Sequence, residues 1–136
     1  MEKLQALAAY LPMLESPDFN AGHIQDSVQT EPGVFTMPYA DYSEEASEFV
    51  QAAYEHGWVL RNFSWGDWKQ TEEAIKLRDD ESALARATPQ QLYQLLTVVI
   101  RQDRFCEGAL LDAFESGLIL RIVRRAADIV KAEEEL

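Results

Sequence analysis

The chain has 136 residues, of which 47% are hydrophobic and 26% are charged, and its formal net charge is −12. This composition is typical of a globular protein rather than a disordered one, and the negative charge disfavours direct binding to nucleic acid. We expect a single acidic helical domain over residues 1–136, since no low-complexity stretch or linker divides the chain.

The sequence contains no apolar run of the roughly 20 residues that a membrane-spanning helix needs. Its start, Met1-Glu2-Lys3-Leu4, lacks the cationic stretch of a signal peptide. The one cysteine, Cys106, cannot form an internal disulfide. These features predict a cytoplasmic protein that does not contact a membrane.

The charge is unevenly distributed along the chain. Residues 1–60 contain ten acidic residues and one basic residue, Lys3, whereas residues 101–131 contain six basic and five acidic residues. An acidic N-terminal face is typical of a soluble surface, and it also fits a partner protein that is basic. Homodimerisation between this face and the arginine-rich C-terminal part is a further hypothesis.

The first predicted element is a helix over residues 2–15, where apolar residues recur every three or four positions. Pro12 is expected to kink or end this helix, because proline lacks the amide that continues the hydrogen-bond ladder.

A two-stranded β-hairpin is predicted near residues 23–40. Pro32 and Gly33 occupy the two central positions of a type II turn, and Phe35, Met37 and Tyr39 alternate along the second strand. Because an isolated hairpin is marginally stable in water, we expect it to pack on the helices.

Ser43 predicts the start of a helix that continues to about His56 and ends at Gly57. Its inward face is expected to include Phe49 and Tyr54.

Ser64 or Asp67 is expected to cap a further helix that runs through about Leu77, and a short helical piece is predicted near residues 82–86.

Thr88 and Gln91 form a capping box around Pro89, which predicts a helix to about Gln102. Asp103 is expected to cap the next helix, and Gly117 to separate it from a last helix that begins at Leu118. The predicted fold is therefore mainly α, a bundle of five to six helices with one small hairpin. The basic residues of the last helix are expected to line its outer face: Arg121, Arg124, Arg125 and Lys131.

Several stretches are similar to a known family. The most specific is Arg104-Phe105-Cys106-Glu107-Gly108 within residues 96–108, followed by residues 113–119. Weaker pieces lie at residues 10–12, 38–43 and 65–68. Together they resemble a family of small bacterial proteins classed as a domain of unknown function. The resemblance implies a shared fold of helices with a small extended region, and it implies no activity, cofactor or site residue.

The segment from Asp103 to Gly108 mixes two acids, a base and a thiol at a predicted junction between helices. A thiol beside an arginine at a helix N-terminus can be nucleophilic. The simpler interpretation is structural: Asp103 caps, Arg104 pairs with Glu107 or Glu115, Phe105 and Cys106 pack, and Gly108 permits close contact. We favour this second interpretation.

Enzymatic chemistry has little support in the residue inventory. His23, His56 and Cys106 are too few for a structural zinc site, and no glycine-rich phosphate loop is present. Neighbouring carboxylates lie on predicted polar faces. We expect no metal and no cofactor, and we favour a protein that is not an enzyme.

Tryptophan is concentrated between residues 58 and 68, and Trp65 and Trp68 share a face if that turn is helical. They either fill the core or anchor a protein interface, where tryptophan is enriched. We favour the core.

The function that these features favour is a non-catalytic protein-interaction or regulatory module with an acidic N-terminal face. One alternative is an acidic inhibitor that mimics nucleic acid and occupies a basic protein, as anti-CRISPR proteins do. Another is a small-ligand binder or enzyme that uses residues 101–115. The candidate binding residues are Arg101, Asp103, Arg104, Glu107, Glu115, Trp65 and Trp68.

Overall fold

The N-terminal apolar stripe forms two helices in the computed structural model, which describes residues 2–135: α1 (Glu2–Ala8) and α2 (Leu11–Glu15). The single helix predicted over residues 2–15 is thus wrong, because the stretch forms two helices. Pro12 lies in the first turn of α2, where its missing amide costs no helical hydrogen bond. The chain therefore breaks before the proline rather than bending around it.

The predicted hairpin is longer than expected and is built from two short sheets, which we call together the arm (residues 22–42). Strands β1 (Gly22–Gln25) and β4 (Tyr39–Tyr42) pair at its base, and β2 (Gln29–Glu31) and β3 (Val34–Phe35) pair near its tip. Both pairs are antiparallel. Gly33 has a φ of 80°, the value that a type II turn requires there.

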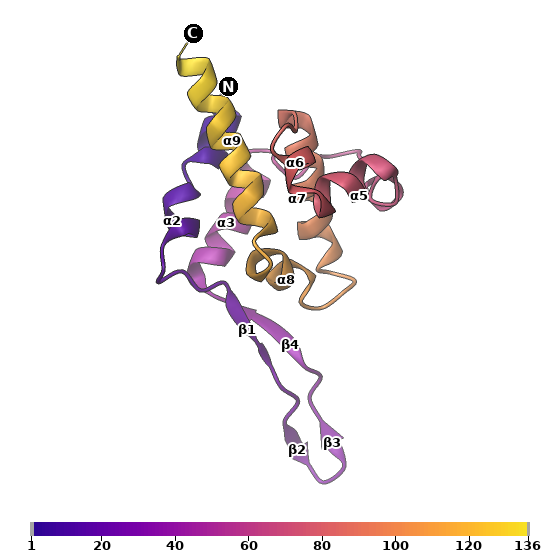
Figure 1. Cartoon of the computed structure of the whole chain (residues 1–136). Coiled ribbons are helices and arrows are strands. Elements are labelled where there is room, and N and C mark those ends of the chain that lie inside the picture. The colour runs from indigo at the N-terminus through magenta and orange to yellow at the C-terminus, as the bar shows by residue number, and fades with distance from the viewer. Residues whose placement is uncertain (1, 136) are drawn as a thin grey trace.

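The arm does not pack on the helices along its length, so that part of the prediction is wrong. Figure 1 shows it projecting from one end of the helical body, with only its base close to the helices. Between residues 26 and 39 every side chain is exposed. The hairpin is held by contacts at its base rather than by burial of one face.

Helix α3 (Glu44–Glu55) starts where predicted, because the side chain of Ser43 accepts a hydrogen bond from the Ala46 amide. Gly57 ends it with a φ of 75°. Phe49 is buried, but Tyr54 remains 45% exposed, so its expected inward position is wrong.

The next stretch contains three short helices, α4 (Trp65–Trp68), α5 (Glu72–Asp79) and α6 (Glu81–Leu84). The single helix predicted from Ser64 or Asp67 to Leu77 is wrong. Thr71 caps α5 through the Ala74 amide, and Asp80 caps α6 through the Ser82 amide. Each cap starts a new helix where the chain changes direction.

The three C-terminal helices are α7 (Pro89–Gln102), α8 (Ala109–Glu115) and α9 (Leu118–Glu134). The capping box of Thr88 and Gln91 is present in both directions, and Gly117 separates α8 from α9 with a φ of 85°. Asp103 lies at the end of α7, and from there its side chain caps the next helix as predicted, because it accepts a hydrogen bond from the Leu110 amide in the first turn of α8.

Helix α9 lies at the centre of the packing, against α1, α2, α6, α7 and α8. The core contains the fully buried side chains of Ile119 and Ile122 from α9, which pack with those of Phe49, Trp58 and Leu96. The predicted mainly helical class is confirmed, and within residues 2–135 six helices have seven residues or more. None of the helices in that range is long and apolar enough to cross a membrane.

Candidate functional site

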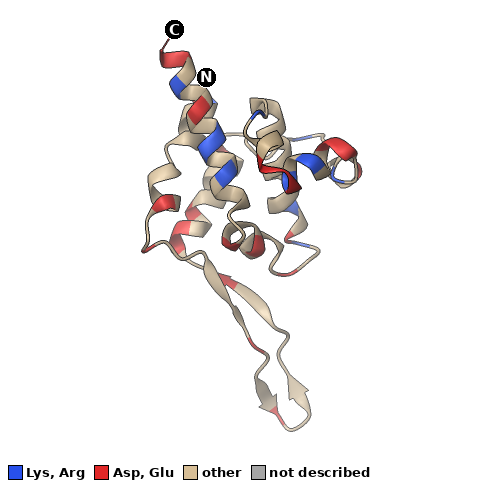
Figure 2. Cartoon of the chain, viewed as in Figure 1, with Lys and Arg blue, Asp and Glu red and all other residues tan. Residues whose placement is uncertain are grey.

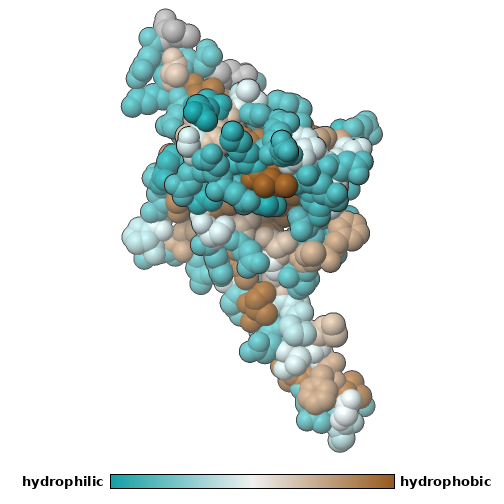
Figure 3. Space-filling model, turned by 45° about the vertical axis from the view of Figure 1, so that its right-hand side comes forward, coloured by the Kyte–Doolittle hydropathy of each residue, from teal (hydrophilic) through white to brown (hydrophobic). Residues whose placement is uncertain are grey.

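The arm exposes six large apolar side chains, which we call the arm patch. Met37 is 81% exposed and Phe35 62%, and the others are each about half exposed. The members of the arm patch are Ile24, Val28, Val34, Phe35, Met37 and Tyr39. Hydrophobic atoms gather toward the free end of the arm in Figure 3. A group of this kind, unneeded for the core, is typical of an interaction surface.

The charge on the arm has one sign. Its ionisable residues include Asp26, Glu31 and Asp41, and no lysine or arginine occurs between Lys3 and Arg61. Figure 2 shows red segments and no blue ones along the arm. The arm patch is therefore apolar with acidic neighbours.

Tyr42 fixes the base of the arm to the start of α8. Its hydroxyl donates a hydrogen bond to Asp103 Oδ1 at 2.8 Å and accepts one from the Leu111 amide at 3.1 Å. Asp103 Oδ1 also accepts from the Leu110 amide at 3.1 Å. The free amides of the first turn of α8 are thus satisfied by side chains from outside the helix. We call Tyr42, Asp103 and these amides the arm anchor.

Two further contacts hold β1 and β4. Glu107 accepts a hydrogen bond from the Ala40 amide through Oε1. Gly108 has a φ of 89°, and a Cβ there would lie 3.3 Å from Ile24 Cδ1. Glycine at position 108 therefore lets the loop turn tightly while the arm passes close to it.

The surroundings of Tyr42 change the pKa of its phenol. Burial and the hydrogen bond to Asp103 raise the pKa of Tyr42 well above its ordinary value. The phenol stays protonated and keeps donating to the carboxylate at neutral pH.

The structure separates the residues predicted around Asp103 into two groups. Asp103 and Glu107 face the arm, whereas the ion pairs within residues 2–135 include neither Arg104 nor Glu115. The predicted pairing of Arg104 with Glu107 or Glu115 is therefore wrong. The local chain turns outward after α7, so charged side chains at its tip meet solvent.

Phe105 and Cys106 were expected to pack inside, and this expectation is wrong. Phe105 is 75% exposed and Cys106 is exposed. Phe105 instead stacks on Trp65, with ring centroids 6.1 Å apart and planes 30° apart. The two rings form a small surface contact between α4 and the loop before α8.

Trp65 and Trp68 are both half-buried, so the expected core position holds for neither in full. Trp68 packs against Phe63 at 5.8 Å between ring centroids. The tryptophan that fills the core is Trp58, which is completely buried and whose Nε1 donates to the Lys3 carbonyl at 3.0 Å.

A hollow of 290 Å³ lies beside Arg104, bounded by Tyr42, Val50 and Tyr54 among others. Its size is at the lower end for small-molecule sites. The carboxylate that faces it, Asp103, is already bonded to the Tyr42 hydroxyl and the Leu110 amide. Within the region predicted to bind a ligand, Asp103 thus serves to hold the arm.

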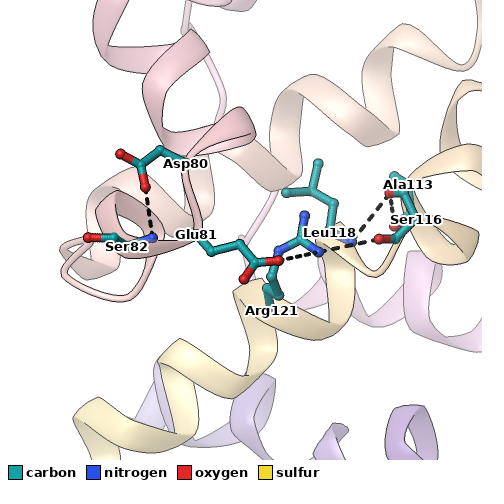
Figure 4. Close-up of polar contacts among 7 residues, drawn as sticks. All are labelled: Asp80, Glu81, Ser82, Ala113, Ser116, Leu118 and Arg121. Atoms are coloured by element: carbon teal, nitrogen blue, oxygen red, sulfur yellow. Dashed lines mark hydrogen bonds and ion pairs between the residues drawn. The ribbon is translucent and has the colours of Figure 1, made fainter.

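The arginines of α9 contact acidic and carbonyl groups of the same chain. Arg121 Nη1 lies 3.8 Å from Glu81 Oε1 and donates to the Ser116 carbonyl, as Figure 4 shows. Arg124 Nη2 pairs with Glu15 at 3.2 Å, and Arg125 Nε donates to the Ala87 carbonyl. These side chains connect α9 to α2 and to the α6 region, which the helical packing brings alongside.

Metal-binding groups are dispersed: in residues 2–135 no three His, Cys, Asp or Glu side chains are placed to hold one ion. The residue that sequence analysis missed is Tyr42, whose role depends on partners more than sixty positions away. The alternation of Phe35, Met37 and Tyr39 was the available signal for the arm patch.

Comparison with known proteins gives a family and no function. No curated protein and no solved structure matches the chain. One family model matches residues 1–132, that of a family of unknown function. Since the match covers nearly the whole chain, this protein belongs to the family of unknown function DUF6508.

Proposed function

We propose that this protein is a non-catalytic protein-binding module that inserts its arm into an apolar groove of a basic partner. The observation that carries the proposal is the arm patch, which exposes side chains such as Phe35 and Met37 on a projecting hairpin. A complex is stabilised when a partner removes exposed apolar groups from water. Aromatic side chains at the centre of such contacts contribute most of the binding energy.

The charge of the arm supports a partner whose groove is bordered by lysine or arginine. Asp26, Glu31 and Asp41 lie along the arm, and Glu44 and Glu45 follow at its base. Complementary charge accelerates association and disfavours wrong partners. A regulatory role would follow if the partner's groove has its own ligand, which the arm would displace.

The alternative of a nucleic-acid mimic is less well supported. A mimic of the phosphate backbone needs acidic groups as its main contact surface, whereas the most projecting part of this molecule carries apolar side chains. Homodimerisation through opposite faces also has less support, because Arg121 and Arg124 already pair with Glu81 and Glu15 of the same chain.

Site-specific crosslinking tests the proposal. A photoreactive amino acid replaces Phe35 in one variant and Ile75, an exposed apolar residue of α5, in the other. We expect a specific protein adduct only from position 35. The crosslinked partner is then identified and purified. Calorimetry measures the Kd of its complex with the unmodified protein and with the variants described next.

The double variant F35S/M37S should raise that Kd about 30-fold or more, the loss expected from two central contacts. The control variant Ile75→Ser should leave it unchanged. A Kd unaffected by F35S/M37S, equal crosslinking at both positions, or an adduct only with a second copy of the chain would each contradict the proposal.

A further inference from the structure

A second hollow, of 570 Å³, lies in the helical body and includes no residue of the arm patch. It is enclosed by the start of α1, the end of α3, the segment that follows α3 and the last turn of α7. Its volume is within the range of small-molecule sites. Nothing in the proposed function of the arm requires it.

The charged side chains around this hollow are mostly basic. Lys3, Arg61 and Arg101 line it together with His56, and Glu55 is the one acid among them. The chain as a whole has 12 lysines and arginines against 24 acids. Three of the few cations thus meet at one place, although they come from distant positions in the sequence.

These three cations meet at one hollow and none of them has an acidic partner within residues 2–135. Arg78 pairs with Asp79, and Arg121 and Arg124 pair as described above. No ion pair within residues 2–135 includes Lys3, Arg61 or Arg101. Arg101 Nε is in addition buried without a hydrogen-bond partner in that range. A buried unpaired donor destabilises the protein unless something accepts from it.

The surroundings hold this cationic group in place. The Lys3 carbonyl accepts from Trp58 Nε1, and Lys3 Nζ lies 4.2 Å from the centre of the Tyr93 ring. His56 stacks on Trp58 with centroids 5.3 Å apart and planes 15° apart. Lys3 and His56 are therefore held against buried Trp58, which limits the entropy that these two side chains lose on binding.

The end of α3 would repel an anion if its carbonyls were free, because a helix C-terminus is partially negative. Here they are bonded to the following loop. The Ala52 carbonyl accepts from the His56 amide, and the Ala53 carbonyl accepts from the amides of Trp58 and Val59. This reduces the negative potential that the helix end presents to the hollow.

We propose that this hollow binds a small phosphorylated molecule, with the phosphate between Lys3, Arg61 and Arg101. A guanidinium group can donate two parallel hydrogen bonds to the oxygens of one phosphate. The ammonium of Lys3 adds a compact positive charge. The Arg101 side chain lines the hollow and has no acidic partner within residues 2–135, so its guanidinium charge is available to an anion. Val59 and Leu60 also line the hollow and offer apolar contact to an organic portion of the ligand.

The test is calorimetric titration of the full chain with inorganic phosphate and glycerol phosphate, and with acetate as a singly charged control. We expect millimolar or tighter binding of the two phosphates, with glycerol phosphate the tighter, and none of acetate. The NMR signal of the Arg101 Nε–H should shift on titration. Absence of binding by both phosphates, or equal binding of acetate, would overturn the proposal.

Variants identify the site. Arg101→Gln and Arg61→Gln should each weaken phosphate binding about tenfold or more, the loss expected for one charge-assisted contact. Arg86→Gln removes the same charge at an exposed position elsewhere and should have no effect. If Arg101→Gln fails to fold, exposed Arg61 still decides the question. Unchanged binding in Arg61→Gln, or equal weakening in Arg86→Gln, would overturn the proposal.

Discussion

In the helical body most large apolar side chains are buried, whereas in the arm they face solvent. Trp58 and Phe49 are completely buried, but Phe35 and Met37 are 62% and 81% exposed. Burial of apolar surface is the main source of folding free energy. The body therefore folds on its core, while the arm keeps its position through a few polar contacts at its base. Its apolar residues are available for something other than folding.

The largest expected effect on the free energy of unfolding comes from a substitution in the core. Trp58→Ala removes an indole that contacts the rings of Tyr10 and Phe49 and donates to the Lys3 carbonyl. We expect a loss of about 3–5 kcal/mol in the free energy of unfolding, measured by urea denaturation. A loss below about 1 kcal/mol would contradict a core centred on this residue.

The arm anchor should show an intermediate effect. Tyr42→Phe leaves Asp103 and the Leu111 amide without the phenol that connects them, at a cost of about 1–3 kcal/mol. Amide hydrogen exchange should accelerate in β1 and β4 more than in α7. Equal exchange of the arm amides in both proteins would show that the arm is held in another way.

The same phenol predicts a dependence of stability on alkaline pH. The pKa of Tyr42 is raised in the folded state by burial and by Asp103, and burial also raises the pKa of Tyr93. The unfolded chain therefore releases these protons first, and the free energy of unfolding should fall as pH rises above 10.0, the ordinary tyrosine value. The decline should be shallower in Tyr42→Phe. A decline of equal slope in both proteins would exclude Tyr42 as a contributor.

A helix cap in the body should have a smaller effect. Thr88→Ala removes the hydroxyl that accepts from the Gln91 amide at the start of α7, which costs about 1 kcal/mol. Chemical denaturation measures it. Thr88→Ser, which keeps the acceptor, is the matched control and should retain most of the stability.

The smallest expected effect is at the tip of the arm. Phe35→Ser exchanges a side chain that is already exposed, so the free energy of unfolding should change by less than about 0.5 kcal/mol. The same denaturation experiment measures it. A loss comparable to that of Trp58→Ala would mean that the arm patch packs on the body in solution and is not exposed.

Local signals accounted for much of the helical body. Ser43, Thr88 and Gly117 mark helix ends at the predicted places because capping depends on residues a few positions apart. The start of α5, which was not predicted, also depends on a local cap. Its cap is Thr71, and the sequence offered Ser64 and Asp67 as competing starts.

The sequence by itself determined the helical class, the hairpin and its turn, and the acidic character of residues 1–60, because each depends on composition or short-range pattern. Only the tertiary structure decided that the arm projects, that Tyr42 meets Asp103, and that Lys3, Arg61 and Arg101 surround one hollow. These outcomes depend on contacts between residues about forty to a hundred positions apart. Such contacts follow from how the helices pack, which local periodicity does not specify.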